Sequence, residues 1–452
     1  MPPPNVVFIM SDNQGAWTLG SHGNPDIRTP HLDRLAAEGL RCERAYCVNS
    51  VCSPCRATCL TGLIPSQHGV HTYLGMEKPD AQMGPDAYCT IGEFRGLPEI
   101  FADRGYVCGL SGKWHLGDSL HPQKGFTDWL TRPTGHTERF VNDVLIRDGA
   151  TYVEPRDVTE VFTDHAIAFI ERNRARPFFL YVPYTGPYGL SQSMLDPYRN
   201  RHWAYYRDRE MASFPREPKH PWLRRNVDLL NNTDAMRNYA AALGGVDDGV
   251  GRLLEALARL GLDEHTLVVY TADQGLCAGH HGMWGMGDHS RPLHTFEEAV
   301  HIPMLWRHPQ GIPAGRTFKP LTCNYDFFPT LLDYLGLADE IPSKPRGPGT
   351  SYAAALRGGE ARMPDAIFHD FENTRMIRTE AWKYTRRHPG GPHELYDMLH
   401  DPGERTNLAG DPKHAALEAE LRARLETFFD RYADPQYDRW RGGRTKASPM
   451  GL

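Results

Sequence analysis

Apolar, β-branched or aromatic runs that end in polar or glycine-rich turns recur along the first two thirds of the chain. They lie at residues 6–10, 106–110, 177–184, 266–270 and 302–306. Helical patterns lie between them at 30–38, with Thr29 as the N-cap, and at 158–174 and 234–260. This alternation predicts an α/β fold in which helices flank a large, mixed but mostly parallel sheet.

Two segments depart from this pattern. Residues 191–232 are rich in Tyr, Trp, Arg and Pro without periodicity, which predicts an insertion near a site or at an interface. Residues 341–350, IPSKPRGPGT, read as a linker, and short antiparallel strands at 366–371, 374–387 and 393–398 precede a helix from about 412 to 432. We therefore predict a catalytic domain over 1–350 and a smaller C-terminal α+β subdomain over 351–452.

The charge balance restricts the class of partner. The 452 residues contain 50 Lys and Arg against 56 Asp and Glu, a net charge of -6, so no basic surface is expected for nucleic acid or anionic lipid. The apolar run at 6–10 is too short for a membrane span and has no basic residues before it, which predicts a cytoplasmic protein unless a leader was trimmed. The aromatic insertion is compatible with a homo-oligomer.

Two of the predicted strands end in an acid beside an amide. The run at 6–10 leads into Asp12 and Asn13, and the run at 266–270 leads into Asp273 and Gln274. Ligands gather beyond the carboxyl ends of strands in such sheets, and four oxygen donors suit Ca²⁺, with Mg²⁺ or Mn²⁺ as alternatives. One such pair alone would fit a turn cap equally well, but two at equivalent strand ends favour a metal site.

The stretch VCSPCRATCLTG, residues 51–62, holds three of the nine cysteines. An odd cysteine count argues against a disulfide framework, and no second pair at matching distance supports zinc. Ser53 as N-cap and Pro54 in the first turn would place Cys52 just outside a helix N-terminus, with Arg56 leaning back toward it. An anion at Cys52 would then meet a helix dipole and a guanidinium together.

Several motifs resemble those of one family. CSPCR followed by LTG resembles the sulfatase signature C-x-P-x-R with a downstream T-G. SDN follows the first strand, and GKWHLG, ADQG and ELYDMLHDPGERTNLA stand at 112–117, 272–275 and 394–409. The set covers nearly the whole chain in the family's order, so the sequence is identified as similar to the formylglycine-dependent sulfatases of the alkaline phosphatase superfamily.

The resemblance implies an activity and a role for each matching residue. The enzyme would hydrolyse a sulfate ester, from a small molecule or a sulfated oligosaccharide, to inorganic sulfate and an alcohol. A formylglycine-generating enzyme would convert Cys52 to formylglycine, whose hydrated aldehyde is the nucleophile. Arg56 would stabilise that group, and Lys113 and His115 would contact the sulfate and the hydrate. The divalent ion, usually Ca²⁺, would be bound by Asp12, Asn13, Asp273 and Gln274.

The sequence departs from the family at two positions. Tyr188 stands where relatives commonly carry a histidine that protonates the leaving oxygen, and Met286 stands where they carry a lysine that contacts sulfate. Neighbouring groups could replace them, and Tyr188, His281 and His289 are the candidate substrate-binding residues. Alternatively the substrate is a phosphonate monoester or phosphodiester, or the protein is a noncatalytic binding protein descended from a sulfatase.

Overall fold

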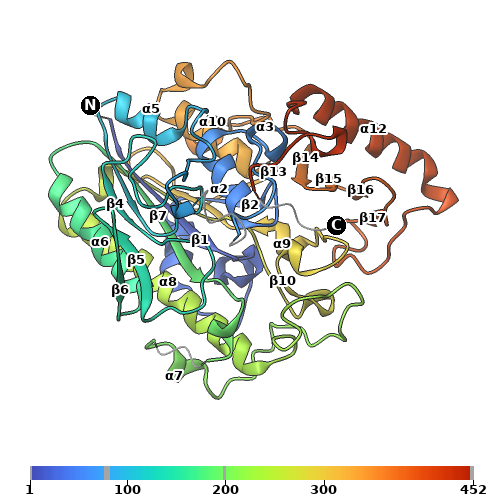
Figure 1. Ribbon diagram of the computed structural model, residues 1–452, viewed down its shortest axis with the longest axis horizontal. Helices are drawn as coiled ribbons and strands as arrows, with labels where there is room; N and C mark the ends of the chain where they lie inside the picture. Colours follow the sequence, from blue (N-terminus) through green and yellow to red (C-terminus); the bar gives the residue numbers. More distant parts are fainter. Residues whose placement is uncertain (1–2, 76–81, 197–199, 448–452) are drawn as a thin grey trace.

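A mixed sheet forms the centre of the protein, described here from a computed structural model over residues 3–75, 82–196 and 200–447 (Figure 1). Its strands in spatial order are β11 (His301–Ile302), β2 (Leu40–Tyr46), β12 (Met304–Arg307), β8 (Thr266–Ala272), β1 (Asn5–Asp12), β7 (Phe178–Pro187), β3 (Val107–Ser111), β4 (Asp128–Thr131), β5 (Asp143–Arg147) and β6 (Ala150–Glu154), and β13 (Arg316–Cys323) pairs with β2.

The middle of this sheet is parallel. Strands β8, β1, β7, β3 and β4 run in one direction, whereas β12, β5 and β6 pair antiparallel toward the two edges. Every residue of β1 is buried, with Val6 and Phe8 in one core cluster and Val7 and Ile9 in the other. A continuous apolar run is therefore required here, since both faces of the strand are covered. The predicted fold class is confirmed.

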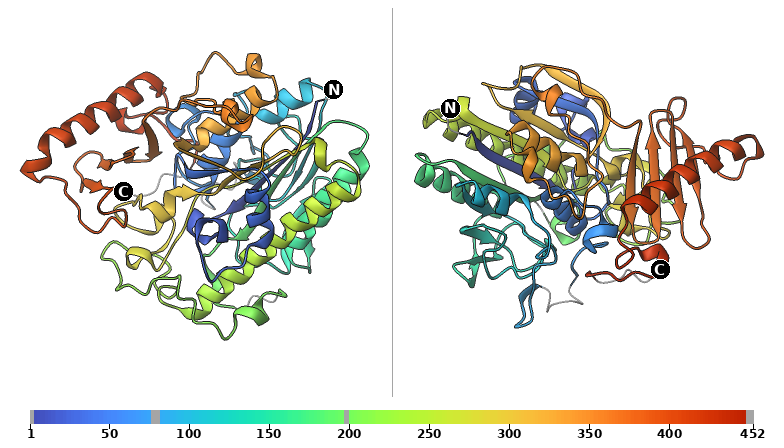
Figure 2. Two further views of the ribbon diagram at one scale, coloured as in Figure 1. Left: turned by 180° about the vertical axis from the view of Figure 1, so that it is seen from behind. Right: turned by 90° about the horizontal axis from the view of Figure 1, so that it is seen from above.

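Helices cover both faces of the sheet, as the two views in Figure 2 show. One face carries α1 (Pro30–Ala37), α6 (Val158–Asn173) and α8 (Thr233–Arg259), and the other carries α2 (Cys52–Thr61), α5 (Leu97–Asp103) and α10 (Asn324–Tyr334). The shorter helices are α3 (Pro65–His68), α7 (Trp203–Tyr206), α9 (Glu297–Val300) and α11 (Ala353–Leu356). In the described part of the chain, no helix is both long and apolar enough to cross a membrane.

The start of α1 corrects one prediction. Thr29 occupies the N-cap position, but its side chain makes no capping hydrogen bond. Instead Asp247, from the middle of α8, accepts the backbone N–H groups of His31 and Leu32 at 3.2 and 2.8 Å. The free N–H groups of a first helical turn need acceptors, and here a distant helix supplies them.

The C-terminal part contains a second sheet, confirming the predicted small antiparallel sheet. Its strands are β14 (Ala366–Phe371), β15 (Thr374–Thr379), β16 (Trp382–Arg387) and β17 (Glu394–Asp397), and α12 (Ala415–Tyr432) packs on it through Leu421, Leu425 and Phe429 (Figure 2). These side chains continue one of the two core clusters of the large sheet. The domain boundary at residue 350 stays a prediction.

The segment 191–232 has little regular structure. It contains α7 and a 3-10 turn at Gln192–Met194, and α7 packs against α8. Three of its residues, 197–199, lie outside the described residues. Where the segment begins and near its end, Ser191, Arg225 and Asn226 line a cavity beside Cys52. This segment therefore contributes to the wall of the site described next.

Candidate active site

Backbone hydrogen bonds join the carboxyl ends of four neighbouring strands, β8, β1, β7 and β3. The N–H of Tyr188, after β7, donates to the carbonyl of Asp12 at the end of β1 (3.0 Å), and the N–H of Asp273, after β8, donates to Ser11 (3.1 Å). Lys113, after β3, donates its N–H to Pro183 of β7 (2.7 Å). These backbone hydrogen bonds hold together the reactive segments that were predicted at separate strand ends.

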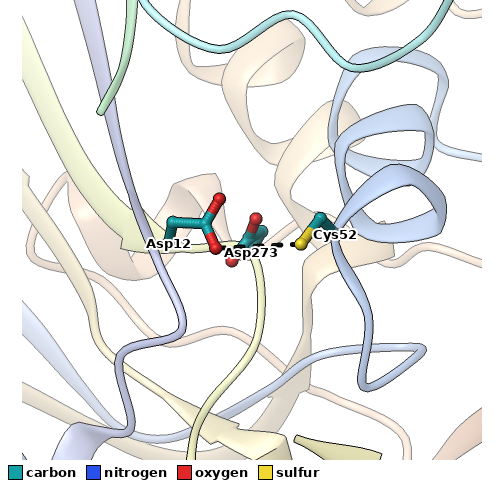
Figure 3. Close-up of side chains that lie close together, drawn as sticks. All are labelled: Asp12, Cys52 and Asp273. Carbon is teal, nitrogen blue, oxygen red and sulfur yellow. Dashed lines mark hydrogen bonds between the residues drawn. The ribbon is translucent and has the colours of Figure 1, made fainter. Parts of the chain in front are cut away.

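Cys52 is the first residue of α2 and lies beside the two aspartates. Its Sγ is 3.7 Å from Oδ1 of Asp12, and ligand atoms of Cys52, Asp12 and Asp273 all lie within 4.8 Å of one another (Figure 3). Burial, followed by the charge of Asp12, raises the pKa of the Cys52 thiol well above its usual value. An unmodified Cys52 is therefore a neutral thiol at physiological pH and a poor nucleophile.

The prediction for the cap of α2 is wrong in one detail. The helix begins at Cys52 with Val51 as its N-cap, and the Ser53 hydroxyl instead accepts the N–H of Leu74 at 3.1 Å. Cys52 still stands at the positive end of the helix dipole. An anion at Cys52 would therefore still meet the helix dipole, as predicted. The structure differs from the prediction only in that Val51, and not Ser53, is the N-cap.

Two buried cations face two buried carboxylates. Nη2 of Arg56 lies 2.6 Å from Asp273 and 3.0 Å from Asp12, and Nζ of Lys113 lies 2.5 Å from Asp12. All four side chains are fully buried. Burial, and then the charge of Asp12, raises the pKa of Asp273 to about 6 despite Arg56 and Lys113. A bound cation would reduce the repulsion between the two carboxylates.

The predicted metal ligands lie together and fit a hard cation. The side-chain amide of Asn13 donates to the Tyr188 carbonyl at 2.6 Å, which turns its Oδ1 toward Gln274. Oε1 of Gln274 is buried and has no hydrogen-bond partner within the described residues. The side chains of Asp12, Asn13, Asp273 and Gln274 together offer oxygen donors of the type that bind Ca²⁺ or Mg²⁺. In this structure Nε2 of Gln274 faces Oδ1 of Asn13, so a rotation of the Gln274 amide would present its unpartnered Oε1 to a cation.

Asn13, His115 and Tyr188 are among the residues of the site that have left-handed backbone conformations. The φ angles of Asn13, His115 and Tyr188 are 58°, 54° and 59°. Asparagine tolerates this region, but for His and Tyr it costs roughly 1–3 kcal/mol each and persists only where the surroundings impose it. Backbone strain of this kind is concentrated at functional sites, which supports the assignment of this region.

His115 has one ring nitrogen engaged and one available. Nε2 lies 3.0 Å from the Leu74 carbonyl, so that nitrogen carries the hydrogen, and Nδ1 is buried with no partner in the described structure. Burial, and then Lys113, lowers the pKa of His115 well below its usual value. A Cβ added to Gly135 would lie 2.0–2.2 Å from atoms of this ring. Gly135 therefore allows the imidazole to lie where it does, as a neutral base.

A cavity of about 320 Å³ opens beside Cys52. The predicted residues His115, Tyr188 and His289 line it, together with Met286, whose Sδ is 3.5 Å from Nε2 of Gln274.

His281 is the exception, which corrects its prediction as a substrate-binding residue. Among the described residues it does not line the cavity; its ring stacks on Phe296 at 3.9 Å, and its Nε2 is 3.0 Å from Glu298.

The cavity wall also contains residues that the sequence analysis did not name individually. Ser191, Arg225 and Asn226 belong to the segment 191–232, which was predicted near a site or at an interface. The others are Tyr73, Leu74, Gly75, Thr134, Gly135, His136, Leu190 and Asp288. Nδ1 of His136 lies 2.8 Å from the Tyr188 hydroxyl oxygen, and the tautomer of the imidazole decides which of the two donates the hydrogen bond. Asp288 directly precedes the predicted His289 in the sequence, so the motif that indicated His289 could also have indicated Asp288. His136 and Arg225 stand in segments that match no motif.

Comparison with known proteins gives a consistent result. The profile of the family described as Sulfatase matches residues 4–337, and a profile described as N-sulphoglucosamine sulphohydrolase, C-terminal, matches residues 282–431. An N-acetylglucosamine-6-O-sulfatase of Bacteroides thetaiotaomicron is 27% identical, over 96% of this chain and 88% of its own length. An N-acetylgalactosamine-6-sulfatase of Canis lupus familiaris is 31% identical, over 79% of this chain and 67% of its own.

A solved structure is similar across the whole fold. It contains an enzyme in complex with its substrate, D-glucosamine-2-N,6-O-disulfate, and superposes with a TM-score of 0.75 at 25% identity. The match covers 95% of this chain and 98% of the other. Both the large sheet and the C-terminal sheet therefore belong to an arrangement already seen in an enzyme with a sulfated sugar bound.

Proposed function

The chain belongs to the sulfatase family and is a sulfuric ester hydrolase, and from this premise we propose that it cleaves the sulfate ester of a sugar with a nucleophile made from Cys52. The observation that carries the proposal is the position of Cys52. Its Sγ lies at a helix N-terminus, within 4.8 Å of ligand atoms of both Asp12 and Asp273. Burial keeps the thiol protonated, which argues against direct attack by sulfur.

The charged groups suit a sulfate ester. Ca²⁺, or Mg²⁺ or Mn²⁺ in its place, would be held by Asp12, Asn13, Asp273 and Gln274, and would supply a Lewis acid for sulfate oxygens. Arg56 and Lys113 balance the two carboxylates, so the charge of a bound cation is left to attract the anionic substrate. Fixed charges in a buried site stabilise the charge that develops as the S–O bond breaks.

His115 is proposed as the base that releases sulfate. The aldehyde hydrate derived from Cys52 offers one hydroxyl to attack sulfur and a second that loses its proton when sulfate is expelled. Nδ1 of His115 is unpartnered among the described residues, and the ring is neutral, so it can accept that proton. Donation from Nε2 to the Leu74 carbonyl holds the ring in the tautomer that this role requires.

Tyr188 is proposed as the acid for the leaving oxygen. Burial raises the pKa of its phenol well above the usual value, so it retains its proton at neutral pH. As the S–O bond breaks, the leaving oxygen takes the electron pair and the phenolic proton. An Nδ1–H on His136, at 2.8 Å, would stabilise the phenolate that forms. This pair would replace the histidine that the family commonly has at this point.

The size of the cavity favours a small substrate. Its volume of about 320 Å³ lies at the lower end of the roughly 300–1,000 Å³ of ligand pockets. Relatives are named for the 6-sulfates of N-acetylglucosamine and N-acetylgalactosamine. We therefore propose that one sulfated sugar ring, alone or at the end of an oligosaccharide, occupies the cavity.

The mass of the tryptic peptide Ala45–Arg56 tests the nucleophile. Coexpression with a formylglycine-generating enzyme should lower the mass by about 18 Da at Cys52, because the CH2SH group becomes an aldehyde, CHO. Cys47 and Cys55 lie in the same peptide and serve as internal controls. The modified enzyme should hydrolyse N-acetylglucosamine 6-sulfate, and Cys52→Ala should not. An unmodified peptide, or an active Cys52→Ala variant, would refute the mechanism.

The same preparation distinguishes the alternative substrate class. Turnover of 4-nitrophenyl sulfate should exceed that of phenylphosphonate or a bis-aryl phosphate if sulfate is the preferred group. The reverse order would favour the phosphonate or phosphodiester reading.

A further inference from the structure

The imidazole of His289 lies in the cavity wall with Nδ1 turned toward its own loop. Nδ1 accepts the backbone N–H of Met286 at 3.2 Å and lies 3.1 Å from Oδ1 of Asp288. The other ring nitrogen, Nε2, has no hydrogen-bond partner within the described residues, and it is not fully enclosed by protein. Because the ring lines the cavity, Nε2 is the polar atom through which His289 can reach a ligand.

The contacts of Nδ1 determine what Nε2 can offer. A neutral imidazole carries one hydrogen, and since Nδ1 accepts from Met286, that hydrogen is on Nε2. A protonated imidazole carries a hydrogen on each nitrogen, and Nδ1 then faces the carboxylate of Asp288. Nε2 is therefore a donor in both states. His289 is suited to hold an oxygen acceptor, whereas His115, with its unpartnered Nδ1, is suited to take a proton.

The loop fixes the position of this donor. A Cβ added to Gly285 would lie 2.5 Å from Cγ of His289, so the ring occupies space that only a glycine leaves open. The carbonyl of His289 accepts the N–H of Arg224 at 2.9 Å, which joins the loop to the segment 191–232. A side chain held in this way loses little conformational freedom when a ligand binds.

We propose that Nε2 of His289 donates a hydrogen bond to a non-bridging oxygen of the sulfate group. The inference rests on the proposed function and adds a sulfate-binding residue to the same site. Met286, in the same loop, has its Sδ 3.5 Å from Nε2 of Gln274, and that nitrogen lies 3.3 Å from Sγ of Cys52. The loop therefore borders the place where the nucleophile would meet the sulfate.

The sulfate suits this donor better than a sugar hydroxyl does. Sulfate oxygens only accept, and hydrogen bonds to an ionised acceptor are roughly twice as strong as those between neutral groups. The buried cations of the site are already committed, since Arg56 contacts both Asp12 and Asp273 and Lys113 contacts Asp12. His289 adds a donor whose hydrogen faces the cavity and no carboxylate.

The test measures His289→Ala on two sulfate esters and on inorganic sulfate. N-acetylglucosamine 6-sulfate and 4-nitrophenyl sulfate share only the sulfate group, so kcat/KM should fall by the same factor on both, roughly 10- to 100-fold for a hydrogen bond to a charged acceptor. The inhibition constant of inorganic sulfate should rise roughly tenfold. His289→Gln should recover part of both losses, because its side-chain amide can also donate.

His400→Ala is the matched control. It removes an imidazole that is 83% exposed and lies 2.9 Å from Asp397, and it should change none of these values. A loss confined to the sugar sulfate, or unchanged kinetics in His289→Ala, would overturn the inference. Equal losses in the Ala and Gln variants, with a lowered Tm in both, would show a structural role and overturn it as well.

Direct binding separates this inference from the proposed function. Calorimetry with inorganic sulfate and the Ca²⁺-loaded protein requires no turnover. A wild-type protein that hydrolyses neither ester but binds sulfate more tightly than His289→Ala would overturn the proposed function and support the sulfate contact. A wild-type protein that neither turns over the esters nor binds sulfate would overturn both.

Discussion

The hydroxyl of Tyr188 lies 2.8 Å from Nδ1 of His136, although 52 residues separate them in the chain. Tyr188 follows β7 with a φ of 59°, so the strained backbone aims the ring into the cavity. Lys113 Nζ lies 5.5 Å from the centre of the same ring. A phenol between an imidazole and an ammonium is well placed to give up a proton at the moment a leaving oxygen needs it.

Tyr188→Phe should affect poor leaving groups selectively. We expect kcat for N-acetylglucosamine 6-sulfate to fall roughly 10²- to 10⁴-fold, because a sugar alkoxide needs protonation, and kcat for 4-nitrophenyl sulfate to change little. Tyr184→Phe is the matched control: Tyr184 is buried on the same strand, and its hydroxyl pairs with Thr163 at 2.8 Å instead. Equal losses of kcat on both substrates would contradict the role of Tyr188 as an acid.

The lowered pKa of His115 predicts how kcat depends on pH below neutrality. Burial lowers the pKa of His115 well below 6.5, so the neutral ring that accepts a proton persists into the acid range. Activity that depends on this base should therefore be retained from pH 7 down to at least pH 6, and be lost only at lower pH. The pH dependence of kcat for 4-nitrophenyl sulfate measures this. A loss centred at or above pH 6.5 would contradict the assignment.

Gly135→Ala should disturb His115 without changing its chemistry. The new methyl group would lie 2.0–2.2 Å from ring atoms, so the imidazole must move. We expect kcat to fall at least tenfold, because a displaced base transfers a proton less efficiently. Gly149→Ala is a control at a glycine with no neighbour within 4 Å, although its φ of 75° makes it slightly strained. An unchanged kcat in Gly135→Ala would show that the position of the ring is not critical.

Removal of the metal should lower both rate and stability. Without a cation, the positive charges paired with Asp12 and Asp273 in the described structure are Arg56, which contacts both, and Lys113, which contacts Asp12. Chelation should abolish turnover and lower Tm, and Ca²⁺ should restore both, since a ligand that binds only the folded state stabilises it. Asp273→Asn should reduce the bound metal per chain, measured by elemental analysis, whereas the exposed Asp148→Asn should not. Full activity after complete chelation would exclude the proposed cofactor.

The central strands, and the clustering of the residues proposed to bind a metal, were predictable because each depends on local sequence. Continuous apolar runs predicted strands buried on both faces, and the polar residues after β1 and β8 had to meet at one edge of the sheet. The family motifs then supplied the identity of Cys52 and Arg56. These predictions depended on the order of strands and turns along the chain. They did not depend on where the loops run in space.

The cavity wall was predictable only in part. Arg225 lies in the segment 191–232 predicted near a site or at an interface, and Asp288 adjoins the predicted His289. His136 reaches the cavity through a loop whose direction depends on packing that no periodicity records. His281 shows the limit of motif position: its ring stacks on Phe296 at 3.9 Å, and among the described residues it does not line the cavity. The residues that would distinguish one sulfate ester from another are therefore only partly indicated by the sequence.

The cap of α1 provides a test that is independent of catalysis. Asp247 accepts two first-turn N–H groups of α1 from α8, a role that the sequence assigned to Thr29. Asp247→Ala should lower the free energy of unfolding by roughly 1–3 kcal/mol, because two buried donors lose their acceptor, and Thr29→Val should cost less. Denaturant unfolding measures both variants, and kcat at saturating substrate should not change in either.

The effect of Asp247→Ala should also depend on pH. Burial raises the pKa of Asp247 to about 7 in the folded protein, above its value in the unfolded chain. The folded state therefore binds this proton more tightly, so the stabilisation is complete below about pH 4 and is lost as pH rises toward 7. The loss of unfolding free energy in Asp247→Ala should accordingly be larger at pH 5 than at pH 8. A loss that is larger at pH 8 would indicate that the carboxylate is stabilised as an anion and that burial does not dominate its titration.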